Sequence, residues 1–111
     1  MNFKKIFFSF FILFPLVALP NQQNDSLLLK AELFYNKGID FGKAGKPDSA
    51  LHYTLHAVEI FETVYTVDSV QLAYAYQSLG IIQKLLGKYK PAIEWYNKSE
   101  EIYKQKRMRI C

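Results

Sequence analysis

Two histidines, His52 and His56, stand four residues apart in the stretch LHYTLHAVE. On a helix this spacing puts both imidazoles on one face, where they can bind the same metal ion. A working site needs three or four converging ligands, and Glu59 is the one further candidate close by in the sequence. The pattern therefore favours two solvated surface histidines, and a small metal-binding protein built on this pair remains an alternative.

Residues for nucleophilic or phosphate chemistry are scarce. The one cysteine, Cys111, is the last residue, and no serine lies in a glycine-flanked strand-to-helix turn. Gly42, Gly45 and Gly87 lack the Lys-Ser or Lys-Thr pair that completes a phosphate-binding loop. We therefore expect no enzymatic activity, no catalytic residues and no cofactor.

Positive charge is concentrated at the two ends of the sequence. The net charge of +4 includes two lysines in the first five residues and four Lys or Arg in the last eight. Cations in the last turn of a helix complement its dipole. Four of them fall short of a basic stripe for nucleic acid, so we expect no nucleic-acid partner.

The first twenty residues have the layout of a secretory signal. MNFKK is basic, residues 6–19 are apolar apart from Ser9, and the polar NQQNDS follows. An apolar run this short suits a signal better than a membrane-spanning helix. We expect residues 1–20 to form a signal peptide or an uncleaved membrane anchor, and 21–26 to form a linker. The protein would then be exported, to a periplasm or to the outside, and would touch a membrane only if the anchor is retained.

Four helices are predicted after the linker. Residues 27–45 and 70–87 have apolar periodicity, and each segment ends on a glycine suited to a left-handed C-terminal cap. Return helices are predicted at 47–65 and 90–106, each with a proline in or near its first turn. The chain is therefore predicted to be all-α, as two helical hairpins.

Two helix-start signals accompany these segments. Asp25-Ser26 precedes the first helix. Asp68 precedes the third and has Gln71 three residues later, which is the spacing of a capping box. We expect these residues to form the N-terminal caps.

The two hairpins repeat one pattern at a distance of 42 residues. Gly38 precedes Ala50 by twelve residues, and Gly80 precedes Ala92 by twelve. A glycine inside a helix costs about 0.5–1 kcal/mol relative to alanine, so its recurrence indicates close approach of a neighbouring helix. The spacing predicts that each alanine lies opposite its glycine.

This doubled pattern resembles the tetratricopeptide repeat, a helix–turn–helix unit whose copies stack into a superhelix. The positions that carry the resemblance, and that it implies pack the repeats, are Phe34, Gly38, Ala50, Tyr76, Leu79, Gly80, Ala92 and Tyr96. The first unit departs from the pattern at Lys37, where leucine is usual, and at Thr54, where an aromatic is usual. Ser99 replaces an alanine in the second unit.

The resemblance implies an α-α superhelix of the long-period type, in an exported bacterial protein. Its two units would span residues 27–67 and 68–106, followed by a basic tail at 107–111. Repeats of this kind bind proteins, so we expect a peptide or partner protein in a concave groove. The alternative is an N-terminal sensory piece of a longer signalling protein, of the histidine kinase or transcription regulator type.

The first helix of each unit would line that groove, as the resemblance implies. The ten groove residues are Glu32, Tyr35, Asn36, Ile39, Lys43, Tyr74, Gln77, Ser78, Ile81 and Lys84.

The last helix has apolar residues over about half of its circumference, namely Ala92, Ile93, Trp95, Tyr96, Ile102 and Tyr103. A helix with a neighbour on one side needs a narrower stripe. This width predicts a covering partner, either a homodimer through the last helix, a docked protein, or further repeats of a longer array.

Overall fold

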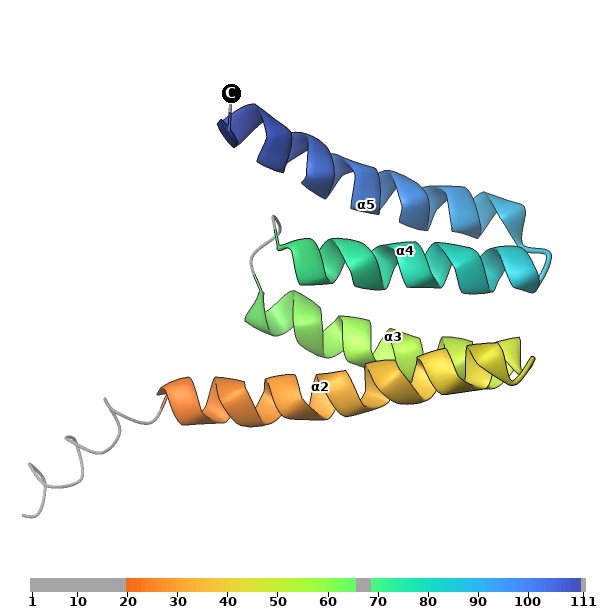
Figure 1. Cartoon of the computed structure of the whole chain (residues 1–111), viewed down its shortest axis with the longest axis horizontal. Helices are drawn as coiled ribbons and strands as arrows, with labels where there is room; N and C mark the ends of the chain where they lie inside the picture. Colours follow the sequence, from red (N-terminus) through yellow and green to blue (C-terminus); the bar gives the residue numbers. More distant parts are fainter. Residues whose placement is uncertain (1–19, 66–68, 111) are drawn as a thin grey trace, which may run out of the picture.

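The computed structural model describes residues 20–65 and 69–110, and these form four helices without a strand. They are α2 (Pro20–Lys43), α3 (Pro47–Val64), α4 (Val70–Leu85) and α5 (Tyr89–Ile110). Figure 1 shows them side by side in chain order, each antiparallel to the next. α2 packs on α3, α3 on α4, and α4 on α5. The prediction of an all-α fold made of two stacked hairpins is confirmed.

The first helix begins earlier than the sequence predicted. α2 starts at Pro20, so Asp25 and Ser26 lie inside the helix and cap nothing, and the predicted linker 21–26 is helical. The apolar part of the predicted signal segment lies outside the described residues. None of the helices in the described part of the chain is both long and apolar enough to cross a membrane.

Two other helix ends also differ from the predicted ones. The N-cap of α4 is Ser69, whose hydroxyl accepts a hydrogen bond from the Leu72 backbone N–H at 3.4 Å. Serine is a good N-cap residue, and Ser69 stands one position nearer the helix than the expected cap, Asp68, which lies outside the described residues. α5 continues to Ile110, so residues 107–110 of the predicted tail are helical.

The glycine caps of α2 and α4 are where the sequence predicted them. Gly45 has a φ of +75° and Gly87 a φ of +77°. The residue after each glycine donates its backbone N–H to the carbonyl five residues earlier, at 2.9 Å in both hairpins. This arrangement satisfies carbonyls at the helix end and fixes the sharp reversal into the return helix.

The helical glycines do allow close approach. The predicted Ala50 does lie against Gly38, through its backbone carbonyl, but the nearest atom to each glycine belongs to another residue. A Cβ on Gly38 would collide with the Thr54 hydroxyl and would lie 3.2 Å from the Ala50 carbonyl oxygen. A Cβ on Gly80 would lie 2.7 Å from the ring of Tyr96. The residue sixteen positions after each glycine therefore covers it. Thr54, which departs from the repeat pattern, fills this contact in the first hairpin.

The outer side of α2 carries lysines over aromatic rings. Leu79 is fully buried in α4, which lies between α3 and α5. Lys37 occupies the corresponding position of α2, and its Nζ lies 5.0 Å from the centroid of the Tyr53 ring. Lys30 lies over Phe34 in the same way, at 5.9 Å. The aliphatic stem can cover a ring while the ammonium group stays in water, which explains the lysine on this outer helix.

One stripe of α3 packs on α4. Leu51, Leu55 and Val58 share this stripe with Glu62, because the four residues are spaced by three or four positions. The Glu62 carboxylate accepts a hydrogen bond from the Tyr76 hydroxyl of α4 at 2.7 Å, so the stripe faces α4. Three of its four positions are apolar, as a helix interface requires.

The corresponding stripe of α5, 42 residues later, faces away from α4 and is mostly polar. It consists of Ile93, Asn97, Glu100 and Lys104, all of them exposed. Glu100 also lies 3.8 Å from the Arg107 guanidinium. The outer side of the second hairpin therefore differs in chemistry from the side of α3 that stacks on α4.

The wide uncovered apolar face expected on the last helix is narrower in the structure. Within that set Ala92 and Ile102 are buried, and Trp95, Tyr96 and Tyr103 are half-buried. Ile93, 57% exposed, is the one member left in solvent. The sequence projection was wrong here because α4 covers more of the α5 circumference than a single narrow stripe.

Tyr76 links the two hairpins through its bond to Glu62 and makes folding sensitive to high pH. Burial first, and then the Glu62 carboxylate, raise the pKa of Tyr76 above its ordinary value. Above about pH 10 the unfolded chain releases this proton while the folded chain keeps it. The contribution of the protonated Tyr76 to the free energy of unfolding is therefore fully present below pH 10 and is lost as the pH rises further.

We predict that Tyr76→Phe flattens this alkaline loss of stability. At pH 7 the variant should unfold about 0.5–1.5 kcal/mol more easily, because it lacks the hydrogen bond to Glu62. Urea unfolding at pH 7, 9, 10 and 11 should show the difference between the two proteins shrinking above pH 10. A difference in the free energy of unfolding that stays constant up to pH 11 would contradict the prediction.

Candidate functional site

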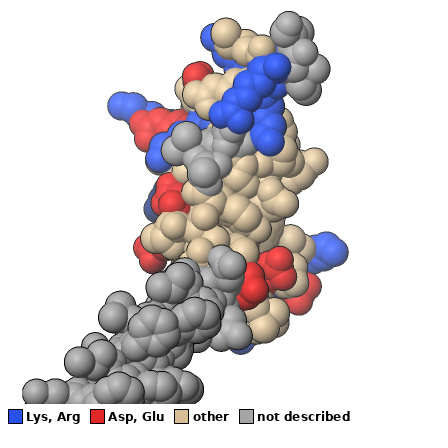
Figure 2. All heavy atoms as spheres, turned by 90° about the vertical axis from the view of Figure 1, so that its left-hand side faces the viewer, with Lys and Arg blue, Asp and Glu red and all other residues tan. Residues whose placement is uncertain are grey.

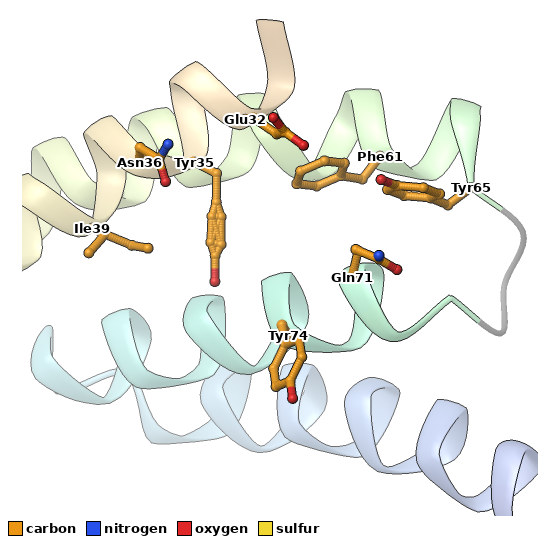
Figure 3. Close-up of a pocket in the computed structure, with 8 residues that line it drawn as sticks. All are labelled: Glu32, Tyr35, Asn36, Ile39, Phe61, Tyr65, Gln71 and Tyr74. Carbon is orange, nitrogen blue, oxygen red and sulfur yellow. The ribbon is translucent and has the colours of Figure 1, made fainter. Parts of the chain in front are cut away.

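A cavity of about 370 Å³ opens on the surface that α2, α3 and α4 share. Its lining side chains come from α2, from α3 and the Tyr65 that follows it, and from α4 (Figure 3). The lining residues are Glu32, Tyr35, Asn36, Ile39, Phe61, Tyr65, Gln71 and Tyr74. Because both hairpins contribute, the cavity exists only when they are stacked.

Three aromatic rings of the cavity pack on one another. Phe61 and Tyr65 are stacked with ring centroids 5.6 Å apart, and they lie next to each other at the end of α3 in Figure 3. Tyr35 meets Phe61 edge to face at 6.2 Å. The Tyr35 hydroxyl also lies 2.6 Å from the Ser78 hydroxyl of α4, which ties the first hairpin to the second. These contacts hold the rings in place before any partner arrives.

The fourth ring extends the aromatic surface toward α5. Tyr74 is 56% exposed and meets Tyr103 of α5 edge to face at 6.2 Å. Burial first, and then the neighbouring Tyr74 and Tyr35, raise the pKa of Tyr103. The tyrosines of α2, α4 and α5 therefore form one continuous cluster.

Besides the tyrosine hydroxyls, the polar side chains of the cavity are one carboxylate and two amides. Glu32 is exposed on α2, and Asn36 and Gln71 are exposed on α2 and α4. Among the described residues no lysine or arginine lines the cavity. Figure 2 shows one end of the molecule, where uncharged side chains fill the middle and most of the visible Lys and Arg side chains lie toward the top.

Half of the ten predicted groove residues line the cavity. Glu32, Tyr35, Asn36, Ile39 and Tyr74 do so. The other half lies outside it: Ser78 supports Tyr35 from α4, and Lys43, Gln77, Ile81 and Lys84 are exposed elsewhere on the helices. Ile39 and Ile81, 42 residues apart, are 40% and 47% exposed.

The sequence analysis missed Phe61, Tyr65 and Gln71 as site residues. Phe61 is 5% exposed and Tyr65 is half-buried, and both lie within the predicted return helix 47–65. An aromatic residue that forms the floor of a cavity has the same sequence pattern as one in the core. Gln71 could have been found, because it lies three positions before Tyr74 on the same helical stripe.

The two histidines lie apart from this cavity. Their ring centroids are 4.7 Å apart, and His56 packs 5.6 Å from the ring of Phe34. Nδ1 of His56 also lies 3.9 Å from a carboxylate oxygen of Glu59. Within residues 20–65 and 69–110, no three His, Cys, Asp or Glu side chains converge on a point that could hold a metal ion.

Comparison with known proteins identifies a repeat family over most of the described fold. A family model described as tetratricopeptide repeat matches residues 29–105. The matched range contains all of α3 and α4, and most of α2 and α5. The comparison with curated proteins gave no match.

Proposed function

Because the chain belongs to the tetratricopeptide-repeat family, a fold that mediates protein–protein interactions, we propose that it binds a peptide segment of a partner protein in the cavity between its hairpins. One observation carries the proposal: four aromatic rings and three polar side chains from three helices surround a single opening. The role is recognition, without a chemical step.

The exposed aromatic surface supports this proposal. Tyr74 and Ile39 leave 56% and 40% of their surfaces in solvent, although both border a cavity. Covering such side chains with an apolar group of the partner is favourable by about 25 cal/mol per Å² buried. Tyrosines also offer a hydroxyl to the partner, and they are common anchors at interfaces.

We predict that Tyr74→Ala weakens peptide binding at least tenfold, because truncating an aromatic anchor typically costs about 2 kcal/mol or more. The probe is a peptide selected from a displayed library of random twelve-residue sequences, with affinity measured by fluorescence anisotropy. Tyr89→Ala is the matched control, since Tyr89 is 64% exposed but lies on α5 outside the cavity. Equal losses in the two variants, or failure to select any binding peptide, would count against the proposal.

Export and self-association extend the proposal. We infer from the basic and apolar start of the sequence that the protein is exported. Cell fractionation with a C-terminal tag checks this inference, and an exclusively cytosolic product would refute it. A homodimer through α5 would have to bury Ile93 beside Asn97 and Glu100. Light scattering over a range of concentrations measures whether it forms.

A further inference from the structure

This inference rests on the proposed function and specifies the partner. We propose that the bound segment presents an arginine side chain as its anchor, held by the aromatic rings of the cavity and by the carboxylate of Glu32. The interaction would combine stacking on tyrosine with an ion pair at the rim.

Charge complementarity is the first argument. Glu32 is the one charged side chain among the eight lining residues, and it is exposed, so it can reach a partner without being desolvated first. A cationic group beside it gains an ion pair, and an acidic group there would be repelled. The basic residues at the end of α5, Lys104, Lys106, Arg107 and Arg109, are not among the lining residues.

The aromatic rings are the second argument. The electron-rich face of a tyrosine attracts a cation within about 6 Å of the ring centroid. This protein already uses the contact: Lys37 lies over Tyr53, and Lys98 lies 4.9 Å over Trp95 and 5.4 Å over Tyr76. All three of these rings lie outside the cavity.

The shape and the polar groups favour arginine over lysine. A planar guanidinium can stack on a ring while its edge donates hydrogen bonds in the same plane. Glu32 offers a carboxylate, and Asn36 and Gln71 offer amide oxygens around the same opening. A lysine ammonium is more strongly hydrated and does not stack, so it would use fewer of these groups at once.

The test uses peptides selected from the same random twelve-residue library against the full chain. We expect arginine to be enriched in the binders, next to an aliphatic or aromatic residue. Replacing that arginine by citrulline, which keeps the shape and removes the charge, should weaken binding about fivefold to thirtyfold. Replacement by lysine should weaken it less than replacement by citrulline.

Variants of the protein test whether Glu32 is responsible for the preference for arginine. Glu32→Gln should lower the affinity for the arginine peptide about fivefold and leave the affinity for the citrulline peptide unchanged. Glu94→Gln, a change at an exposed acid on α5, is the matched control and should alter neither affinity. Circular dichroism of both variants should match the parent protein, because both carboxylates are exposed.

The outcomes separate this inference from the proposed function. Suppose that peptides bind and Tyr74→Ala abolishes their binding, but arginine is not enriched and the citrulline peptide binds equally well. Peptide binding in the cavity is then supported, and the arginine anchor is refuted. Enrichment of acidic peptides would refute it in the same way. If no peptide binds at all, both proposals fail. Peptide binding that disappears as the protein self-associates would show that a second copy occupies the cavity, and would refute the arginine segment as its occupant.

Discussion

Replacing Leu79 by alanine lowers the free energy of unfolding by about 2–5 kcal/mol, the range for large-to-small changes in a core. Leu79 is fully buried in α4, and it is among the largest side chains completely removed from solvent. α4 packs on both α3 and α5, so the empty space left by the shorter side chain lies where the two hairpins meet. A short repeat array has few such contacts, and a single loss is therefore a large share of its stability.

Leu85→Ala is the control on the same helix. Leu85 is 62% exposed, so the change should lower the free energy of unfolding by less than about 0.5 kcal/mol. Urea unfolding followed by helical circular dichroism measures both variants. If Leu79→Ala leaves no folded baseline, Leu79→Met, which conserves volume and should cost less than about 1.5 kcal/mol, keeps the comparison measurable. A loss at Leu79 no greater than at Leu85 would overturn this account of the core.

Replacing Gly38 by alanine destabilises the first hairpin by about 1–3 kcal/mol, as overpacking of a filled site does. The added methyl group meets the Thr54 hydroxyl and two backbone atoms of α3, the Ala50 carbonyl oxygen at 3.2 Å and the Thr54 nitrogen at 3.3 Å. Backbone atoms cannot rotate away, so α2 and α3 must separate. This cost exceeds the gain of about 0.5–1 kcal/mol that alanine brings to a helix.

Two other glycines provide the comparison. The nearest atoms to a methyl group added by Gly80→Ala belong to the ring of Tyr96, a half-buried side chain that can tilt, so this change should cost less than Gly38→Ala. Gly42→Ala meets nothing closer than 4.0 Å, so it should be neutral or stabilise by up to about 1 kcal/mol. Thermal unfolding of the three variants should follow this order. A Gly38→Ala protein as stable as Gly42→Ala would show that the two helices are not held apart by these atoms.

Local sequence signals predict most of the fold. Glycine caps, prolines in first turns and the apolar periodicity of each segment depend on neighbours a few residues away. The described residues form four helices whose ends lie within a few residues of the predicted ones, except that α2 begins at Pro20 instead of residue 27. The 42-residue repeat then determined that the helices pair as two similar hairpins. Local signals were ambiguous at the start of α2 and α4, where several polar residues compete for one cap.

The sequence by itself determined the helices, their pairing, the tetratricopeptide family and five of the eight residues that line the cavity. Only the tertiary structure decided that Thr54 and Tyr96 cover the helical glycines, and that Phe61 and Tyr65 face a cavity as well as the core. It also decided that the outer stripe of α5 is mostly polar. The physical reason is that these properties depend on how one helix is shifted and rotated against the next. Periodicity along a single helix gives its apolar side but leaves that relative placement open.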